Sequence, residues 1–172
     1  MLTADQAEWV ARALNETGGE LEVLTTAHLA LHSAHEGYAH PLQALDRLKA
    51  EVWKSPRKRD LPAMHRAAVA VSGAALRLLV DVVLWGQGHR WHDDRVELGL
   101  TQVRDELERA VALHPPMASA HEGYAVLLEE VDELRDEIWR GEGMLMHAEA
   151  VQVVAMAARF MVDVTLPALG TA

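Results

Sequence analysis

The heptapeptide SAHEGYA occupies residues Ser33–Ala39 and occurs again, unchanged, at Ser119–Ala125, 86 positions later. The match continues at an offset of 86 and then, after a loop, at an offset of 82. The first copy therefore carries four extra residues in that loop. The further matches are Leu42 with Leu128, Asp46 with Asp132, Leu48 with Leu134, Glu51 with Glu137, Trp53 with Trp139, Met64–His65 with Met146–His147, Arg77 with Arg159, and Val80–Val82 with Val162–Val164. An internal repeat of this length predicts a duplicated structural unit.

Helix-favouring residues dominate both copies. Aromatic residues make up only 5% of the 172 residues, and no Asn-Gly hairpin turn occurs, so strand signals are nearly absent. We therefore expect an all-α protein, with Thr3 capping the first helix, the Gly18–Gly19 pair ending it, Pro41 bending the second and Asp60 capping the third. The expected helices cover about 4–15, 20–54, 60–85, 94–114, 117–140 and 144–166.

Each copy is a helix, a connection and a second helix, which together are too small to bury their apolar stripe alone. We expect the two hairpins to pack as a pseudo-twofold four-helix bundle, with the helices that precede each copy on its flanks. Residues 1–172 would then form a single all-α domain, with one copy at about 20–85 and the other at about 94–166.

Residues that both copies retain are predicted to have structural roles. Glycine in the repeated heptapeptide should let helices approach closely across the twofold axis, and arginine and aspartate four residues apart should form ion pairs within a helix. These residues are Gly37 and Gly123, Tyr38 and Tyr124, Trp53 and Trp139, Arg77 with Asp81, and Arg159 with Asp163.

The chain is acidic, with 26 acidic and 16 basic side chains and a formal charge of −10. Such a charge repels nucleic acids and anionic membranes, so neither is an expected partner. The absence of cysteine excludes disulfides and thiolate metal sites and suits a reducing compartment. The first residues resemble no signal peptide, and Arg77 and Asp81 interrupt the apolar stretch Ala67–Trp85, which predicts a buried helix in a cytoplasmic protein.

The acidic excess lies in the second copy. Residues 35–54 hold three acids and three bases, whereas the aligned residues 121–140 hold seven acids and two bases. At about 100° per residue, five acids share one arc of the second copy's first helix. They are Glu129, Glu130, Glu133, Asp136 and Glu137, and their counterparts are Gln43, Ala44, Arg47, Ala50 and Glu51. The next helix offers Glu149 and Gln152 on one side.

Crowded carboxylates repel one another, and a hard divalent cation such as Mg²⁺ relieves that repulsion by taking oxygen ligands. A solvated amphipathic helix shows the same periodicity without any ion. Both interpretations of the acidic arc follow from the spacing alone.

The acids of the second copy resemble the MazG-like all-α nucleoside triphosphate pyrophosphohydrolase superfamily, in which a Glu-Glu-x-x-Glu helix precedes a Glu-x-x-Asp helix. The HEGYA text and the segment Glu149–Val153 also resemble MazG-like phage proteins, for which the host cytoplasm would be the location. The resemblance implies Mg²⁺ or Mn²⁺ as cofactor, a nucleoside triphosphate or related nucleotide as substrate, and hydrolysis to monophosphate and pyrophosphate. The implied metal ligands are Glu129, Glu130, Glu133, Glu149 and Gln152, with Glu130 and Glu133 catalytic.

The sequence departs from the family pattern in two places. Gln152 stands where the family has aspartate and brings no charge to a metal site, and the first copy keeps only Glu51 of the acids. Two functions therefore remain open: a magnesium-dependent pyrophosphohydrolase, or a catalytically inactive protein of the MazG fold that binds a nucleotide or a protein partner. Because of the duplication, one chain would contain what two subunits supply in single-copy relatives. The duplicated chain could in addition form a homodimer.

Overall fold

The computed structural model describes residues 2–170, which contain six long helices and no strand, as the all-α prediction required. The helices are α1 (Ala4–Ala27), α2 (Ala34–Val52), α3 (Leu61–Leu78), α4 (His92–Leu113), α5 (Ala120–Arg140) and α6 (Gly143–Phe160). A π-helical segment, Leu79–Leu84, continues α3, and a second one, Met161–Thr165, joins α6 to the short helix α7 (Leu166–Gly170). Pro56–Lys58 form a single 3₁₀ turn between α2 and α3.

The boundary between the first two helices differs from the prediction. Helix α1 begins at a Thr3 capping box, as expected, but it runs through Gly18 and Gly19 and ends at Ala27. Glycine costs about 1 kcal/mol in a helix interior, and burial of apolar side chains on both sides of the pair, including Leu21, outweighs that cost.

The predicted helix over 20–54 is consequently two helices. The chain leaves α1, crosses residues 28–33 without helix, and enters α2, where the Ser33 side chain accepts a hydrogen bond from the Glu36 backbone N–H. Pro41 lies inside α2, which continues to Val52. The other four predicted helices are present, with ends shifted by a few residues.

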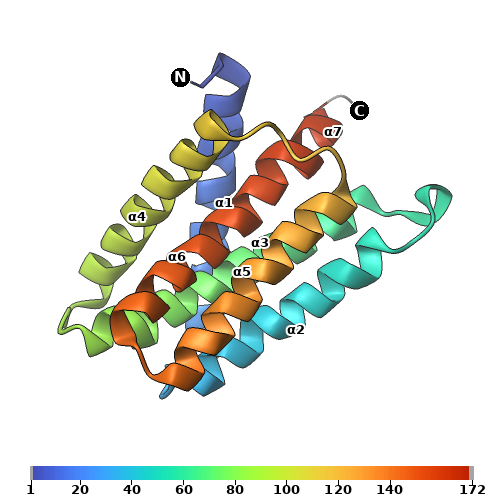
Figure 1. Ribbon diagram of the computed structural model, residues 1–172. Helices are drawn as coiled ribbons and strands as arrows, with labels where there is room; N and C mark the ends of the chain where they lie inside the picture. The colour runs from blue at the N-terminus through green and yellow to red at the C-terminus, as the bar shows by residue number, and fades with distance from the viewer. Residues whose placement is uncertain (1, 171–172) are drawn as a thin grey trace.

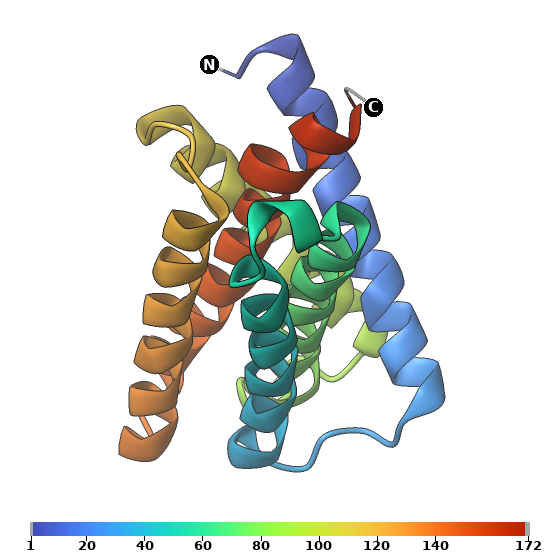
Figure 2. The same cartoon turned by 90° about the vertical axis from the view of Figure 1, so that its right-hand side faces the viewer.

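Two helical hairpins, α2–α3 and α5–α6, form the centre of the protein (Figure 1). Helix α3 packs against α6 and α2 packs against α5, while α1 covers α3 and α4 covers α6. Figure 2 shows α1 and α5 on opposite sides of the molecule. The apolar stretches Leu61–Leu84 and Gly143–Gly170 are long enough to cross a membrane, but 72% and 67% of their most apolar windows are buried within the protein, as in core helices.

Corresponding residues of the two halves make reciprocal aromatic contacts. Each tryptophan at the end of one half's first helix packs on the histidine and tyrosine of the other half's HEGYA segment. The pairs and their ring-centroid distances are Trp53–His121 (5.0 Å), Trp53–Tyr124 (5.0 Å), Trp139–His35 (4.7 Å) and Trp139–Tyr38 (6.0 Å). This reciprocity joins α2 to α5 at both ends of their contact.

Within each half, a buried arginine and aspartate fix the connection that enters the HEGYA helix. The aspartate accepts a hydrogen bond from a backbone N–H of that connection, and the arginine donates to its backbone carbonyls. In the first half, Asp81 accepts from the Leu31 N–H and Arg77 donates to the Leu29 C=O. In the second half, Asp163 accepts from the Met117 N–H and Arg159 donates to the Pro115 C=O. These contacts give both ion pairs the structural role that the repeat predicted.

The repeated glycines act within each hairpin and not, as predicted, across the axis between the halves. A Cβ atom at Gly37 would lie 2.4 Å from Leu78 Cδ1, and one at Gly123 would lie 2.6 Å from Phe160 Cδ2. Leu78 and Phe160 belong to the second helix of the same half. Glycine thus permits the close approach of α2 to α3 and of α5 to α6.

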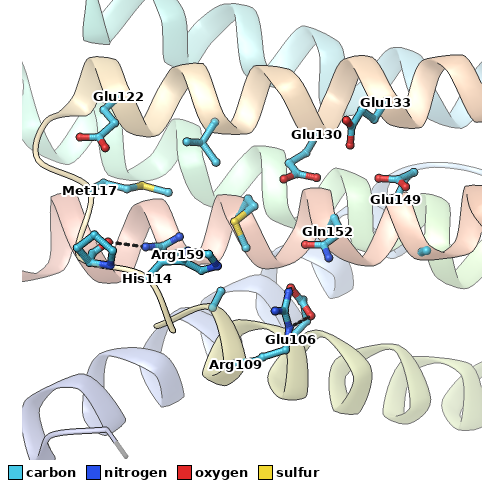
Figure 3. Close-up of a pocket in the computed structure, with 15 residues that line it drawn as sticks. Glu106, Arg109, His114, Met117, Glu122, Glu130, Glu133, Glu149, Gln152 and Arg159 are labelled. Atoms are coloured by element: carbon cyan, nitrogen blue, oxygen red, sulfur yellow. Dashed lines mark hydrogen bonds and ion pairs between the residues drawn. The ribbon is translucent and has the colours of Figure 1, made fainter. Parts of the chain in front are cut away.

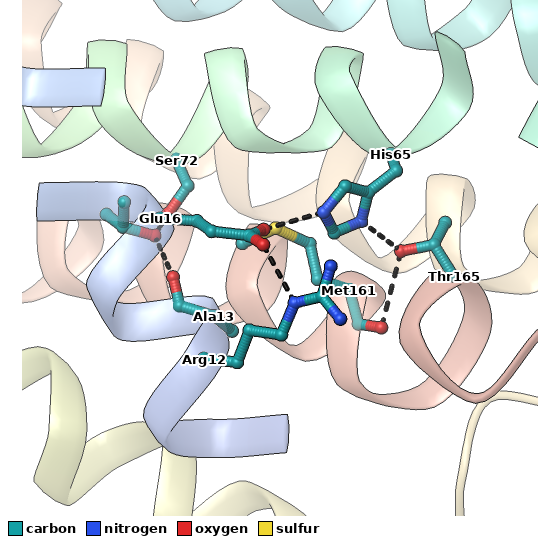
Figure 4. Close-up of polar contacts among 8 residues, drawn as sticks. Arg12, Ala13, Glu16, His65, Ser72, Met161 and Thr165 are labelled. Atoms are coloured by element: carbon teal, nitrogen blue, oxygen red, sulfur yellow. Dashed lines mark hydrogen bonds and ion pairs between the residues drawn. The ribbon is translucent and has the colours of Figure 1, made fainter. Parts of the chain in front are cut away.

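A polar network, buried at His65 and Thr165, ties α1 to the core (Figure 4). His65 Nε2 lies 2.6 Å from Glu16 Oε2, and His65 Nδ1 lies 2.7 Å from Thr165 Oγ1. Arg12 Nε donates to the other Glu16 oxygen at 2.9 Å. The network connects α1, α3 and the π-helical segment that follows α6, and so holds the flanking helix α1 against the core.

Candidate metal centre

Three carboxylates from two helices converge in the second half (Figure 3). Glu130 and Glu133 lie one turn apart on α5, and Glu149 faces them from α6. One carboxylate oxygen from each lies within 4.8 Å of the others. Ligand oxygens of a Mg²⁺ ion, each about 2.1 Å from it, lie about 3 to 4 Å apart, so small side-chain rotations would bring all three onto one cation.

The electrostatics of this triad match the crowding that the sequence indicated. Burial, and then the charges of Glu133 and Glu149, raise the pKa of Glu130 to about 7. Burial and Glu133 also raise the pKa of Glu149 above its usual value. At pH 7 Glu130 is therefore protonated in about half of the molecules, and a cation would displace that proton on binding.

The other acids of the predicted arc lie elsewhere. Glu129 is exposed on α5 and outside the triad, although its charge still contributes to the raised pKa of Glu130. Asp136 is exposed and pairs with Arg135 at 3.0 Å, whereas Glu137 is buried and pairs with Arg140. Of the five acids in the predicted arc, Glu130 and Glu133 line the cavity and the other three do not.

A cavity of about 580 Å³ opens beside the triad, between α4, α5 and α6. Gln152 lines it one turn after Glu149 (Figure 3). Glu106 of α4, which the sequence analysis did not single out, also lines it; hydrogen bonds from Arg109 and Gln152 contribute to holding the pKa of Glu106 below its usual value. The repeat pairs Glu106 of α4 with Glu20 of α1. Only the packing of α4 on α6 shows that Glu106 belongs to this site.

The first half has no such site. The counterparts of the triad and Gln152 are small or basic. In addition, α1 packs closely on α3 at Gly73, where an added Cβ atom would lie 2.4 Å from Glu20 Cγ. Those counterparts are Ala44, Arg47, Ala67 and Ala70. Among residues 2–170, no second group of histidine, aspartate or glutamate side chains converges as this triad does.

The basic loop after α2 does not contribute to the cavity. Lys54 pairs with Glu51, and Arg59 Nη2 lies 3.4 Å from His121 Nδ1, at the start of α5. None of the loop's basic residues lines the space beside the triad.

Comparisons with models of known protein families, with curated protein sequences and with solved structures gave no significant match.

Proposed function

We propose that this protein is a divalent-cation-dependent nucleotide pyrophosphohydrolase of the MazG type, which hydrolyses a nucleoside triphosphate to the monophosphate and pyrophosphate. The observation that carries the proposal is the convergence of Glu130, Glu133 and Glu149 beside a cavity of about 580 Å³. The proposal includes a pseudo-twofold bundle of two MazG-like hairpins, which the reciprocal tryptophan contacts support.

The donor set suits a hard cation. Every candidate ligand atom is an oxygen, from the three carboxylates and the amide of Gln152, and Mg²⁺ and Mn²⁺ prefer such ligands to the nitrogen and sulfur that zinc favours. The bound cation would polarise a phosphoryl group and favour attack by water. Glu130 and Glu133 would hold that cation between α5 and Glu149 of α6, and so fix where the attacking water lies relative to the phosphoryl group.

One feature favours a catalytically inactive, nucleotide-binding protein as the second candidate. Gln152 replaces a charged ligand of the family pattern with a neutral one, and its amide contributes to lowering the pKa of Glu106. A weaker cation site could still bind a nucleotide without hydrolysing it.

The test is a panel of standard and modified nucleoside triphosphates, incubated with Mg²⁺ or Mn²⁺ and assayed for pyrophosphate. We expect release from at least one substrate and a rate at least 100-fold lower for Glu130→Gln and for Glu133→Gln, the range seen when a group that stabilises the transition state is removed. Glu129→Gln is the matched control, since it removes the same charge from an exposed position on the same helix.

An inactive wild type across the panel would contradict the proposal, as would triad variants that react as fast as the control. Nucleotide binding without turnover, measured by calorimetry, would instead support the second candidate.

A further inference from the structure

The cavity beside the triad has acidic side chains at both ends, because Glu122 lines the end opposite the three glutamates (Figure 3). The three glutamates lie at one end, and His114 and Arg159 lie at the other. Arg109 projects from α4 between these ends, next to Glu106. A ligand that binds a cation at the triad would therefore have the Arg109 guanidinium as a neighbour in the same cavity.

Arg159 and Arg109 have different kinds of counterpart in the first half. Arg159 corresponds to Arg77, and both donate to backbone carbonyls of the connection in their own half, so Arg159 is needed for the fold. Arg109 corresponds to Val23. Like the acids of the triad, the Arg109 cation is present only in the half that contains the cavity.

Arg109 is half exposed and pairs with a carboxylate of its own helix. Its Nε and Nη2 atoms both donate to the Glu106 carboxylate, and its side chain is 51% exposed. The Gln152 amide also contributes to lowering the pKa of Glu106, so a polar group beside the Glu106 carboxylate would remain if Arg109 moved away. A guanidinium fits phosphate oxygens as well as it fits a carboxylate, because both offer two acceptors to its planar fork.

We infer that Arg109 is a phosphate-binding residue, which exchanges Glu106 for phosphoryl oxygens when a cation-loaded polyphosphate enters the cavity. The inference rests on the proposed function, because the triad repels a polyphosphate until a cation neutralises it. The polyphosphate chain then extends from the triad to Arg109.

The experiment is calorimetric titration of magnesium pyrophosphate, and separately of magnesium alone, into wild type, Arg109→Gln and Arg104→Gln. Arg104 is exposed on the same helix and outside this cavity, so its variant makes the same charge change. We expect Arg109→Gln to weaken pyrophosphate binding about tenfold or more, since it removes charge-assisted hydrogen bonds. It should leave magnesium binding unchanged or tighter, because Glu106 loses its counter-charge, and Arg104→Gln should change either affinity less than about twofold.

The outcomes separate this inference from the proposed function. Pyrophosphate binding that depends on Arg109 supports the inference even if no nucleoside triphosphate is cleaved. Cleavage with equal kcat/KM in wild type and Arg109→Gln overturns the inference and leaves the pyrophosphohydrolase proposal standing. Equal pyrophosphate affinities for the two arginine variants, or no binding to wild type, also overturn it.

Discussion

Replacing Glu130 with glutamine should stabilise the metal-free protein above neutral pH. The pKa of Glu130 rises from 4.5 to about 7 on folding, so between these values the folded protein holds a proton that the unfolded chain releases. One pKa unit corresponds to about 1.4 kcal/mol, so ionisation of Glu130 removes about 3 kcal/mol of the wild type's unfolding free energy as pH rises through this window. The glutamine amide has the shape of the protonated carboxyl and no charge, so the variant avoids this loss.

Urea denaturation in the presence of a chelator, followed by circular dichroism, measures the effect. Wild type and Glu130→Gln should have similar unfolding free energies at pH 4.5, and the variant should exceed wild type by about 3 kcal/mol at pH 8, or about 6 to 12 °C in Tm. Saturating Mg²⁺ should stabilise wild type at pH 8 more than it stabilises the variant. Glu129→Gln, exposed on the same helix, should differ from wild type by about 0.5 kcal/mol or less.

Parallel pH profiles for wild type and Glu130→Gln would refute this reasoning. They would mean that water screens the triad well enough for its carboxylates to ionise freely. The electrostatic argument for a cation at this site would then have no basis.

Two further substitutions test the site and the packing behind it. Gln152→Asp should tighten Mg²⁺ binding about tenfold in calorimetry, because it adds a charged oxygen ligand, and an unchanged affinity would place residue 152 outside the coordination sphere. Gly123→Ala should cost about 1 to 3 kcal/mol in urea denaturation, since its Cβ would lie 2.6 Å from Phe160 Cδ2. Gly143→Ala, with nothing within 4 Å of the added carbon, should change the unfolding free energy by less than about 1 kcal/mol; equal losses would contradict the close approach of α5 to α6.

The repeat held more information about the helix boundaries than the local signals did. The chain breaks between α4 and α5 at Pro115–Pro116, which marks a helix end clearly. The corresponding connection, residues 28–33, has neither proline nor glycine, so local signals left it inside a predicted helix. Transferring the break by the repeat offset, together with the Ser33 and Glu36 capping pattern, would have ended α1 correctly.

The site was predictable to the extent that it depends on one helix. Spacing placed Glu130 and Glu133 on the same face of α5, but it could not decide whether Glu129 or Glu130 faces inward, because the two differ by about 100° around the helix. The roles of Glu106 and Arg109 depend on how α4 packs on α6. That packing is a tertiary property with no signature in the local sequence.

The asymmetry between the halves has an energetic consequence. The contacts that hold the bundle, the tryptophan pairs and the arginine–aspartate pairs, occur in both halves, whereas the acidic triad occurs in one. A symmetric assembly of identical hairpins would carry the triad twice, and each copy without its cation would cost about 3 kcal/mol above neutral pH by the pKa of Glu130. Domains of this size are stable by only about 5 to 15 kcal/mol, so two such sites would remove a large part of that margin. Joining the halves in one chain lets Ala44 and Arg47 replace the acids of the first copy, and the cost is incurred once.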